Sequence, residues 1–287
     1  MSWQPVNKPS RWRKMPKSEY HRAEAYLRAR EKFCVAACAR FLRMGDNRGR
    51  IWYLDGAGDE FSALLLHTHR SLFPVFDQNH RIPSPRFLNR FLGKVPVHAV
   101  QGLQKDADIL ERLMENYGYF ASERNDYALM SLDDAPRPES LKSGPAGLVL
   151  RSPLPEDMEP LFALQAAYEQ EEVLPENAVF NAAACRLNLQ HIVSREYILV
   201  AELNDQLIGK INTSAESFTR YQIGGVYVRP DCRSRGIGLK MTASFVQNLL
   251  TQGKGLTLFV KKRNAAAGKV YRKVGFNVLE DYRISYY

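Results

Sequence analysis

Apolar and polar positions follow regular patterns in two regions of the chain. In the first region, residues 18–42 place apolar side chains at helical spacing behind an N-cap serine, which predicts one long helix ending near Gly45. Three strand-like runs follow, "RIWYLDG", "EFSALLLHT" and "SLFPVFD", and the turn-rich "DGAGDE" separates the first two. The remaining runs predict a short helix in "SPRFLNRFLG", a strand in "PVHAVQG", a helix in "KDADILERLMENYG" and a strand in "DYALMSL".

The second region predicts a sheet of mixed direction with helices on both faces. A strand at "GLVLRSPL" precedes two helices and three strands, and the helix "GLKMTASFVQNLLTQG", the strand "GLTLFVK", the helix "NAAAGKVYRKVG" and a final strand complete the order β-α-α-β-β-β-α-β-α-β. The segment between the two regions is rich in Pro, Gly and Ser. We therefore expect an α/β protein with a basic arm at 1–17, an N-terminal α/β domain at 18–132, a linker at 133–147 and a C-terminal domain at 148–287.

The positive charge of the chain is concentrated near its beginning. The formal net charge is +9, and residues 1–50 hold 13 Lys and Arg against 4 Asp and Glu, so 13 − 4 = +9 accounts for all of it. Such a basic arm suits contact with RNA through phosphate neutralisation. A solvated tail and helix face is the alternative, and we favour it because no aromatic platform is interleaved with the charges.

Composition limits the cell compartment in which we expect the protein and the kinds of site that we expect it to contain. The N-terminal stretch lacks the apolar core of a signal peptide, and no window is apolar enough to span a bilayer, so we expect a soluble, cytoplasmic protein. The four cysteines show no C-x-x-C spacing, and only His191 among six histidines lies in the C-terminal domain. We expect no metal site, and we interpret the cysteines as small buried hydrophobic residues.

The stretch "VYVRPDCRSRGIGLKM" brings glycines to the point where a predicted strand turns into a helix. Gly236 and Gly238 remove the Cβ atoms that shield backbone N–H groups. Exposed N–H groups and the positive end of a helix dipole favour a phosphate or pyrophosphate, and Arg233 and Arg235 add charge. A purely structural glycine turn is the alternative. The segment lacks the pattern of a P-loop and the third glycine of a dinucleotide fingerprint.

Two motifs in this region resemble those of the GNAT superfamily of acyl-CoA-dependent N-acetyltransferases. The first is R-x-x-G-x-G, with a V-x-P lead-in at 228–230, and the second is N-x-x-A-x-x-x-Y-x-x-x-G-F in "NAAAGKVYRKVGF". The resemblance covers residues 148–287 and implies acetyl-CoA as cosubstrate. It implies cofactor contacts from Val226, Val228, Arg233, Ser234, Arg235, Gly236, Ile237, Gly238, Asn264, Ala267 and Tyr271. The pantetheine arm is expected in a V-shaped gap beside the strand that carries the two valines.

The second motif also has an interpretation from spacing. Asn264, Ala267 and Tyr271 share one helical face, and the small Ala267 leaves room beside the helix. Tyr271 is our candidate acid for the departing thiolate, and a tyrosine packed on the sheet is the alternative. The superfamily often has a glutamate on the strand before the glycine turn, but "YQIGGVYV" has no acid. Glu171 and Glu172 are therefore candidates to bind or deprotonate the acceptor amine, with solvated helix-end residues as the alternative.

The predicted function is transfer of an acetyl or other short acyl group from its CoA thioester to a primary amine on a small molecule or protein. A CoA-binding sensor or interaction module is the main alternative, and the basic arm suggests an RNA-associated acetyltransferase as a third. The element order of residues 18–132 resembles a GNAT domain without its cofactor turn, that is, a degenerate copy. An unrelated α+β domain is the other possibility there.

Overall fold

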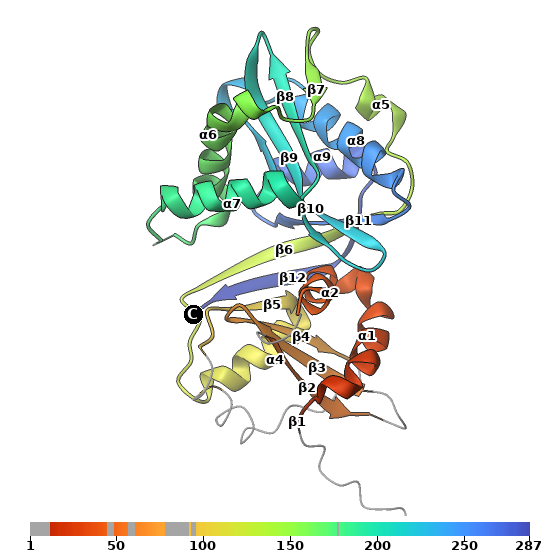
Figure 1. Cartoon of the computed structure of the whole chain (residues 1–287), viewed down its shortest axis with the longest axis vertical. Helices are drawn as coiled ribbons and strands as arrows, with labels where there is room; N and C mark the ends of the chain where they lie inside the picture. Colours follow the sequence, from red (N-terminus) through yellow and green to blue (C-terminus); the bar gives the residue numbers. More distant parts are fainter. Residues whose placement is uncertain (1–11, 45–48, 57–60, 78–91, 93–95, 177) are drawn as a thin grey trace, which may run out of the picture. The chain divides into compact units, whose positions relative to one another are not determined.

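The chain forms two compact units, Met1–Asp126 together with Asp281–Tyr287, and Tyr127–Glu280. The computed structural model describes residues 12–44, 49–56, 61–77, 92, 96–176 and 178–287 (Figure 1). Most of the expected basic arm, the helix expected in "SPRFLNRFLG" and most of the turn "DGAGDE" lie outside the described residues. No helix in the described ranges is long and apolar enough to cross a membrane.

The first unit is a sheet in the order β1-β2-β3-β4-β5-β12, covered by helices. Its strands are β1 (Arg13–Lys14), β2 (Gly49–Asp55), β3 (Phe61–Thr68), β4 (Ser71–Phe76), β5 (Ala99–Leu103) and the end of β12 (Asn277–Tyr286), and its helices are α1 (Tyr20–Arg28), α2 (Val35–Leu42) and α4 (Gln104–Glu115). The strands pair antiparallel except for β4 with β5, which are parallel. The three strand-like runs of the sequence are thus the meander β2, β3 and β4.

The prediction of one helix over residues 18–42 is wrong, because the helix breaks between α1 and α2. Arg30 has φ −118° and ψ 5°, outside the helical region. Its N–H donates to Leu27 O at 3.0 Å, a bond one residue shorter than the α-helical one. Its guanidinium donates to the freed carbonyl of Tyr26 at 3.4 Å and lies 3.8 Å from the centre of the Tyr26 ring. The chain therefore leaves the α-helix at Arg30, where apolar spacing alone predicts that it continues, and the Arg30 side chain bonds the carbonyl that the break leaves free.

The second unit is a sheet in the order β6-β11-β10-β9-β8-β7. Its strands are β6 (Glu123–Leu132), β7 (Val149–Arg151), β8 (Ile198–Leu203), β9 (Gln206–Glu216), β10 (Arg220–Val228) and β11 (Gly255–Lys261). Its helices are α5 (Pro138–Leu141), α6 (Met158–Tyr168), which runs on into the π-helical turn η4 (Glu169–Val173), α7 (Ala182–Arg195), α8 (Ile237–Leu250) and α9 (Ala265–Val274). The predicted element order for this region is confirmed. Only β10 and β11 pair in parallel among these described strands.

Helices cover both faces of the second unit's sheet (Figure 1). On one face, Leu161 and Leu164 of α6 and Leu189 of α7 pack with Tyr227 of β10. On the other face, the buried side chains of α8 and α9 pack against the sheet, and Val226 and Val228 lie against this cluster. Successive β10 side chains thus enter opposite layers, as expected for a strand buried on both faces.

The structure divides the chain differently from the expected domain boundaries. Residues 127–132 of β6 pair with β11 in the second unit, whereas residues 282–286 of β12 pair with β5 in the first. The segment 133–147, expected as a linker, packs within the second unit. There Ser140 is buried and its hydroxyl donates to Lys273 O at 2.9 Å. Each unit therefore completes its sheet with a strand from the far side of the expected boundary.

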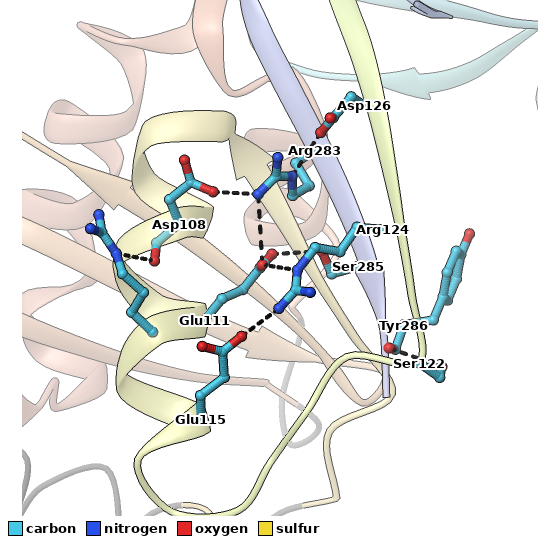
Figure 2. A network of polar contacts seen from close by, with 10 residues as sticks. Asp108, Glu111, Glu115, Ser122, Arg124, Asp126, Arg283, Ser285 and Tyr286 are labelled. Carbon is cyan, nitrogen blue, oxygen red and sulfur yellow. Dashed lines mark hydrogen bonds and ion pairs between the residues drawn. The ribbon is translucent and has the colours of Figure 1, made fainter. Parts of the chain in front are cut away.

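A polar network holds the end of β12 in the first unit (Figure 2). Glu111 of α4 is buried, and its carboxylate accepts from Ser285 Oγ at 2.6 Å and from Arg124 Nε at 2.7 Å. Arg283 Nε donates to Asp126 at 2.7 Å, and its guanidinium also pairs with Asp108. A buried carboxylate needs such donors because burial removes its water. The network thus ties the last strand to α4.

We expect Glu111→Ala to destabilise the first unit by about 3 kcal/mol, because it leaves Arg283 and Arg124 without their buried partner. Glu115→Ala is the matched control. Glu115 pairs with the same Arg124 but is partly exposed, so its loss costs about 1 kcal/mol or less. The measurement is urea unfolding followed by tryptophan fluorescence, which reports the first unit through its buried Trp12 and Trp52, since no tryptophan occurs after residue 52 of the sequence. Equal losses in the two variants would contradict the anchoring role.

Candidate active site

The strands β10 and β11 part inside the second unit's sheet. Their parallel pairing runs from Arg220 opposite Gly255 to Ile223 opposite Leu258. Beyond that pair, β10 continues to Val228 and β11 to Lys261 without further pairing to each other in this fully described stretch. The V-shaped gap expected from the sequence is therefore a feature of the backbone.

Backbone groups of β10 point into this gap. Arg229 N donates to Ile208 O of β9 at 2.8 Å, and Tyr227 pairs with Lys210 of β9. Because N–H and C=O groups of successive strand residues point to opposite edges, Val228, which lies between these two residues, directs its own away from β9, toward the gap. The Val228 carbonyl accepts from Arg233 Nε at 2.9 Å.

The glycine turn lies between β10 and α8. Ser234 and Gly236 have φ of +62° and +79°, and Gly236 is the N-cap of α8. A Cβ on Gly236 would lie 2.8 Å from Gly144 N, so this glycine is required by the fold itself. A Cβ on Gly238 would meet only Val228 Cγ2, at an ordinary 3.7 Å. Ile237 is buried and anchors the first turn of α8, whose N–H groups have no intrahelical acceptors.

Arg233 ties the glycine turn to the end of α6. Its guanidinium donates to both carboxylate oxygens of Glu171, at 2.9 and 2.7 Å, and lies 5.3 Å from the centre of the Tyr227 ring. The hydrogen bonds from Glu171 raise the pKa of Arg233. Arg233 therefore holds the turn in place, whereas Arg235 stays exposed.

Both candidate carboxylates lie in the π-helical turn that follows α6. Glu171 is ion-paired with Arg233, and Glu172 accepts from Asn264 Nδ2 at 2.9 Å. Asn264 also caps α9, because its Oδ1 accepts from Ala267 N at 3.0 Å. Such π-helical turns occur frequently at functional sites. This turn brings Glu172 to the N-terminus of α9, which carries Tyr271.

Tyr271 is buried in α9 with its ring edge-on to Phe276, the centres 6.1 Å apart. Burial raises the pKa of its hydroxyl, and Tyr168 and Glu172 raise it further. The hydroxyl thus keeps its proton at neutral pH and remains available as a donor. The structure brings Glu172 beside Asn264 and Tyr271 of the second motif, although 92 residues separate Glu172 from Asn264 in the sequence.

Lys210 was not singled out by sequence analysis, yet its ammonium is buried in this site. Its Nζ donates to Asn212 Oδ1 and to Gly225 O, both at 3.0 Å, and lies 4.8 Å from the centre of the Tyr168 ring. Burial lowers the pKa of Lys210 to about 7, and nearby Glu169 and Cys185 oppose that change. The strand run "QLIGKINTSAES" carries the signal, a lysine among apolar residues of a strand covered on both faces.

Gly225 makes room for this lysine at a bulge in β10. The register of β10 against β9 shifts between Gly224 and Tyr227, and Gly225 has φ +58°. A Cβ there would lie 2.7 Å from Lys210 Nζ, and Gly225 N donates to the Tyr168 hydroxyl at 3.3 Å. The glycine pair in "YQIGGVYV" indicates such a bulge, since glycine inside a strand marks a bulge or a close approach.

Comparisons with known proteins agree with this architecture. Residues 158–276 match the sequence profile of the Acetyltransferase (GNAT) family. A Drosophila protein of known structure is 13% identical with a TM-score of 0.64, covering 97% of this chain and 99% of its own. A GCN5-related N-acetyltransferase from Sphaerobacter thermophilus is 20% identical with a TM-score of 0.61, covering 96% and 94%. A comparison with curated protein sequences finds no match.

A third structure bears on the organisation of both halves. It is a tandem GNAT protein from the clavulanic acid biosynthesis pathway, 11% identical with a TM-score of 0.57 over 96% of this chain and 97% of its own. At these identities the likeness concerns the fold. Residues 158–276, within the second unit, therefore form a GNAT acetyltransferase domain, and the chain is an acyltransferase of mixed α/β fold.

The different surroundings of the two motif glycines give a test of the glycine turn. We expect acetyl-CoA to raise the melting temperature of the wild type, because ligand at 100 times its Kd stabilises the native state by about 2.7 kcal/mol. Gly238→Ala should retain the shift, since its methyl group has space, and Gly238→Glu should abolish it through bulk and like charge. The measurement is thermal unfolding with and without acetyl-CoA. If the melting temperature of Gly238→Glu still rises with acetyl-CoA, the glycine turn is not part of the binding site.

The buried Lys210 predicts a pH dependence of stability. Its folded pKa of about 7 lies below the usual 10.5, so between these values the unfolded state binds a proton that the folded state has released. The contribution of Lys210 to the free energy of unfolding therefore rises with pH from about 7 to about 10.5. Lys210→Met should lack this contribution. Denaturant unfolding of both proteins from pH 6.5 to 9.5 checks this, and parallel curves would contradict a buried lysine that loses its proton.

Proposed function

We propose that the second unit transfers an acetyl or other short acyl group from its CoA thioester to a primary amine. The observation that carries this proposal is the parting of β10 from β11 beside a glycine turn that opens α8. A parted strand edge offers N–H and C=O groups to an extended amide-containing chain such as pantetheine. The turn offers N–H groups and a helix dipole to its pyrophosphate.

The binding residues follow from this placement. Val226 and Val228 would line the pantetheine arm, and the amides of residues 234–238 would hold the pyrophosphate. Ala267, partly buried on α9, packs beside the same core cluster as both valines. Arg235, at a variable position of the R-x-x-G-x-G motif, is exposed and would contact the phosphates, whereas Arg233 is ion-paired with Glu171.

The chemistry assigns separate roles to Tyr271 and Glu172. The amine nitrogen attacks the thioester carbon, the carbon–sulfur bond breaks, and the CoA sulfur gains a proton. Tyr271 would donate that proton, since its raised pKa keeps the hydroxyl protonated until the thiolate forms. Glu172 would bind the incoming ammonium and take its first proton, directly or through water, and the second proton, left on the nitrogen after attack, would return to Tyr271 once the tyrosine has protonated the sulfur. Of the two candidates, Glu172 fits this role better because Glu171 is already ion-paired with Arg233.

The first unit has a similar parting of parallel strands, but its own side chains fill it. The pairing of β4 with β5 is limited to Ser71 opposite Ala99 and Leu72 opposite Val100. Beyond it, the buried Asp106 of α4 accepts from Phe76 N at 3.2 Å, and Pro74 lies against Gly102. The N–H of Phe76 is thus already bonded and Pro74 has none, so neither of these β4 residues can donate to pantetheine. We therefore propose one acetyl-CoA site per chain.

The experiment combines binding and turnover on the full chain. Titration calorimetry with acetyl-CoA should give one site per chain, and release of CoA thiol should accelerate when a panel of primary amines and a lysine-containing protein are added. Mass spectrometry of the mixture identifies which acceptor gains the acyl group. Binding without transfer to any acceptor would favour a CoA-dependent sensor, and absence of binding would overturn the proposal.

Replacement of Tyr271 by phenylalanine tests the proton donor. We expect kcat to fall about 100-fold with little change in acetyl-CoA affinity, because an acid that acts in the transition state contributes little to ground-state binding. Tyr221→Phe is the matched control, since Tyr221 is equally buried but lies where β10 still pairs with β11. Its kcat should stay close to that of the wild type. Wild-type kcat in Tyr271→Phe would leave Tyr271 a packing role only.

A further inference from the structure

The peptide between Gly225 and Val226 connects the buried ammonium to the gap. Its carbonyl, on Gly225, accepts from Lys210 Nζ at 3.0 Å. Its N–H, on Val226, therefore points away from Lys210, and Val226 lies beyond the last β10–β11 pair, at the parted edge of β10. In a trans peptide the C=O and N–H groups point in opposite directions, so one planar unit joins the two places.

We propose that Lys210 is a positioning residue that acts through this peptide, its ammonium polarising the Gly225 carbonyl so that the Val226 N–H binds the acyl carbonyl oxygen more strongly. The inference rests on the proposed function, because it requires a thioester in the gap. It adds a residue from β9, outside both sequence motifs, to the groups that prepare the thioester for attack.

Physical chemistry gives the proposal its direction. A hydrogen bond from a charged donor is roughly twice as strong as a neutral one, and bonds in a chain strengthen one another by about 10–30%. Loss of the proton from Lys210 leaves an amine that still reaches Gly225 O but donates weakly. The Val226 N–H then becomes a weaker partner for the carbonyl oxygen, which carries increasing negative charge as the amine attacks.

The surroundings of Lys210 provide both donor geometry and a titration near neutral pH. Among the described residues, the ionisable groups that face it are Tyr168 of α6, Glu169 of the π-helical turn, Cys185 of α7 and Tyr227 of its partner strand β10. Two acceptors and the Tyr168 ring surround Nζ, which suits an ammonium. Complete burial favours the neutral amine, whereas Glu169 and Cys185 favour the ammonium, and together these effects bring the pKa of Lys210 to about 7.

The test compares two ligands that differ only in the carbonyl oxygen. The ratio of the Kd of S-ethyl-CoA, a thioether without an ionisable thiol, to the Kd of acetyl-CoA, measured by calorimetry from pH 6 to 8.5, isolates the contribution of the carbonyl oxygen. Titration of the phosphates cancels because both ligands carry them. In the wild type we expect the ratio to fall by up to about twofold as pH rises through 7, because the Val226 N–H loses the polarisation that the ammonium supplies through the peptide.

Three variants move this titration in different ways. Lys210→Met should make the ratio independent of pH. Asn212→Asp places a carboxylate beside Nζ and should shift the fall to higher pH, and Glu169→Gln removes a carboxylate that raises the pKa of Lys210 and should shift it lower. Glu169→Gln keeps the Oε1 that accepts from Gln165 and Asn188, so the local hydrogen bonds survive.

Each result decides between roles. A lysine that merely fills the core would give a ratio independent of pH in the wild type, or the same fall in Lys210→Met, and either result overturns the inference. The opposite shifts in Asn212→Asp and Glu169→Gln support it even if Lys210→Met does not fold. Absence of binding by both ligands overturns the proposed function and this inference with it, whereas binding of both with a constant ratio overturns the inference alone.

Discussion

The bulge at Gly225 is the constraint on which the active-site architecture depends. A strand paired on both edges offers no free backbone groups, so β10 must separate from β11 before it can bind anything along its edge. The bulge turns β10 at that point, and the left-handed glycine leaves space for Lys210 and Asn212 beneath it. The bend, the buried charge and the open edge are thus parts of one local structure.

A second set of contacts fixes the elements around that edge. Arg233 links the glycine turn to Glu171, and Asn264 links the start of α9 to Glu172. The π-helical turn therefore contacts both of the segments that carry the sequence motifs.

The sequence predicted most of the second unit because its signals are local. Strand and helix periodicity identified β7 to β12, and the two motifs identified the turn and α9. The sequence did not predict the roles of Lys210, Gly225 and Tyr168, because these roles arise only when β9, β10 and α6 come together. The break of the helix at Arg30 was not predicted, because the bond from its side chain to a backbone carbonyl leaves no sign in the spacing of apolar residues. The exchange of β6 and β12 between units escaped because pairing between distant strands leaves no local pattern.

That exchange affects how the protein is made. During synthesis, domains generally fold in order from the N-terminus as they leave the ribosome. The first unit cannot follow that order, because residues 281–287 belong to it and the Glu111 carboxylate cannot accept from Ser285 until those residues have been synthesised. Until then, the edge of β5 that later pairs with β12 is open to pairing with other chains. The half of the protein that is translated first is therefore completed last, and it depends on protection of that edge while the remainder is translated.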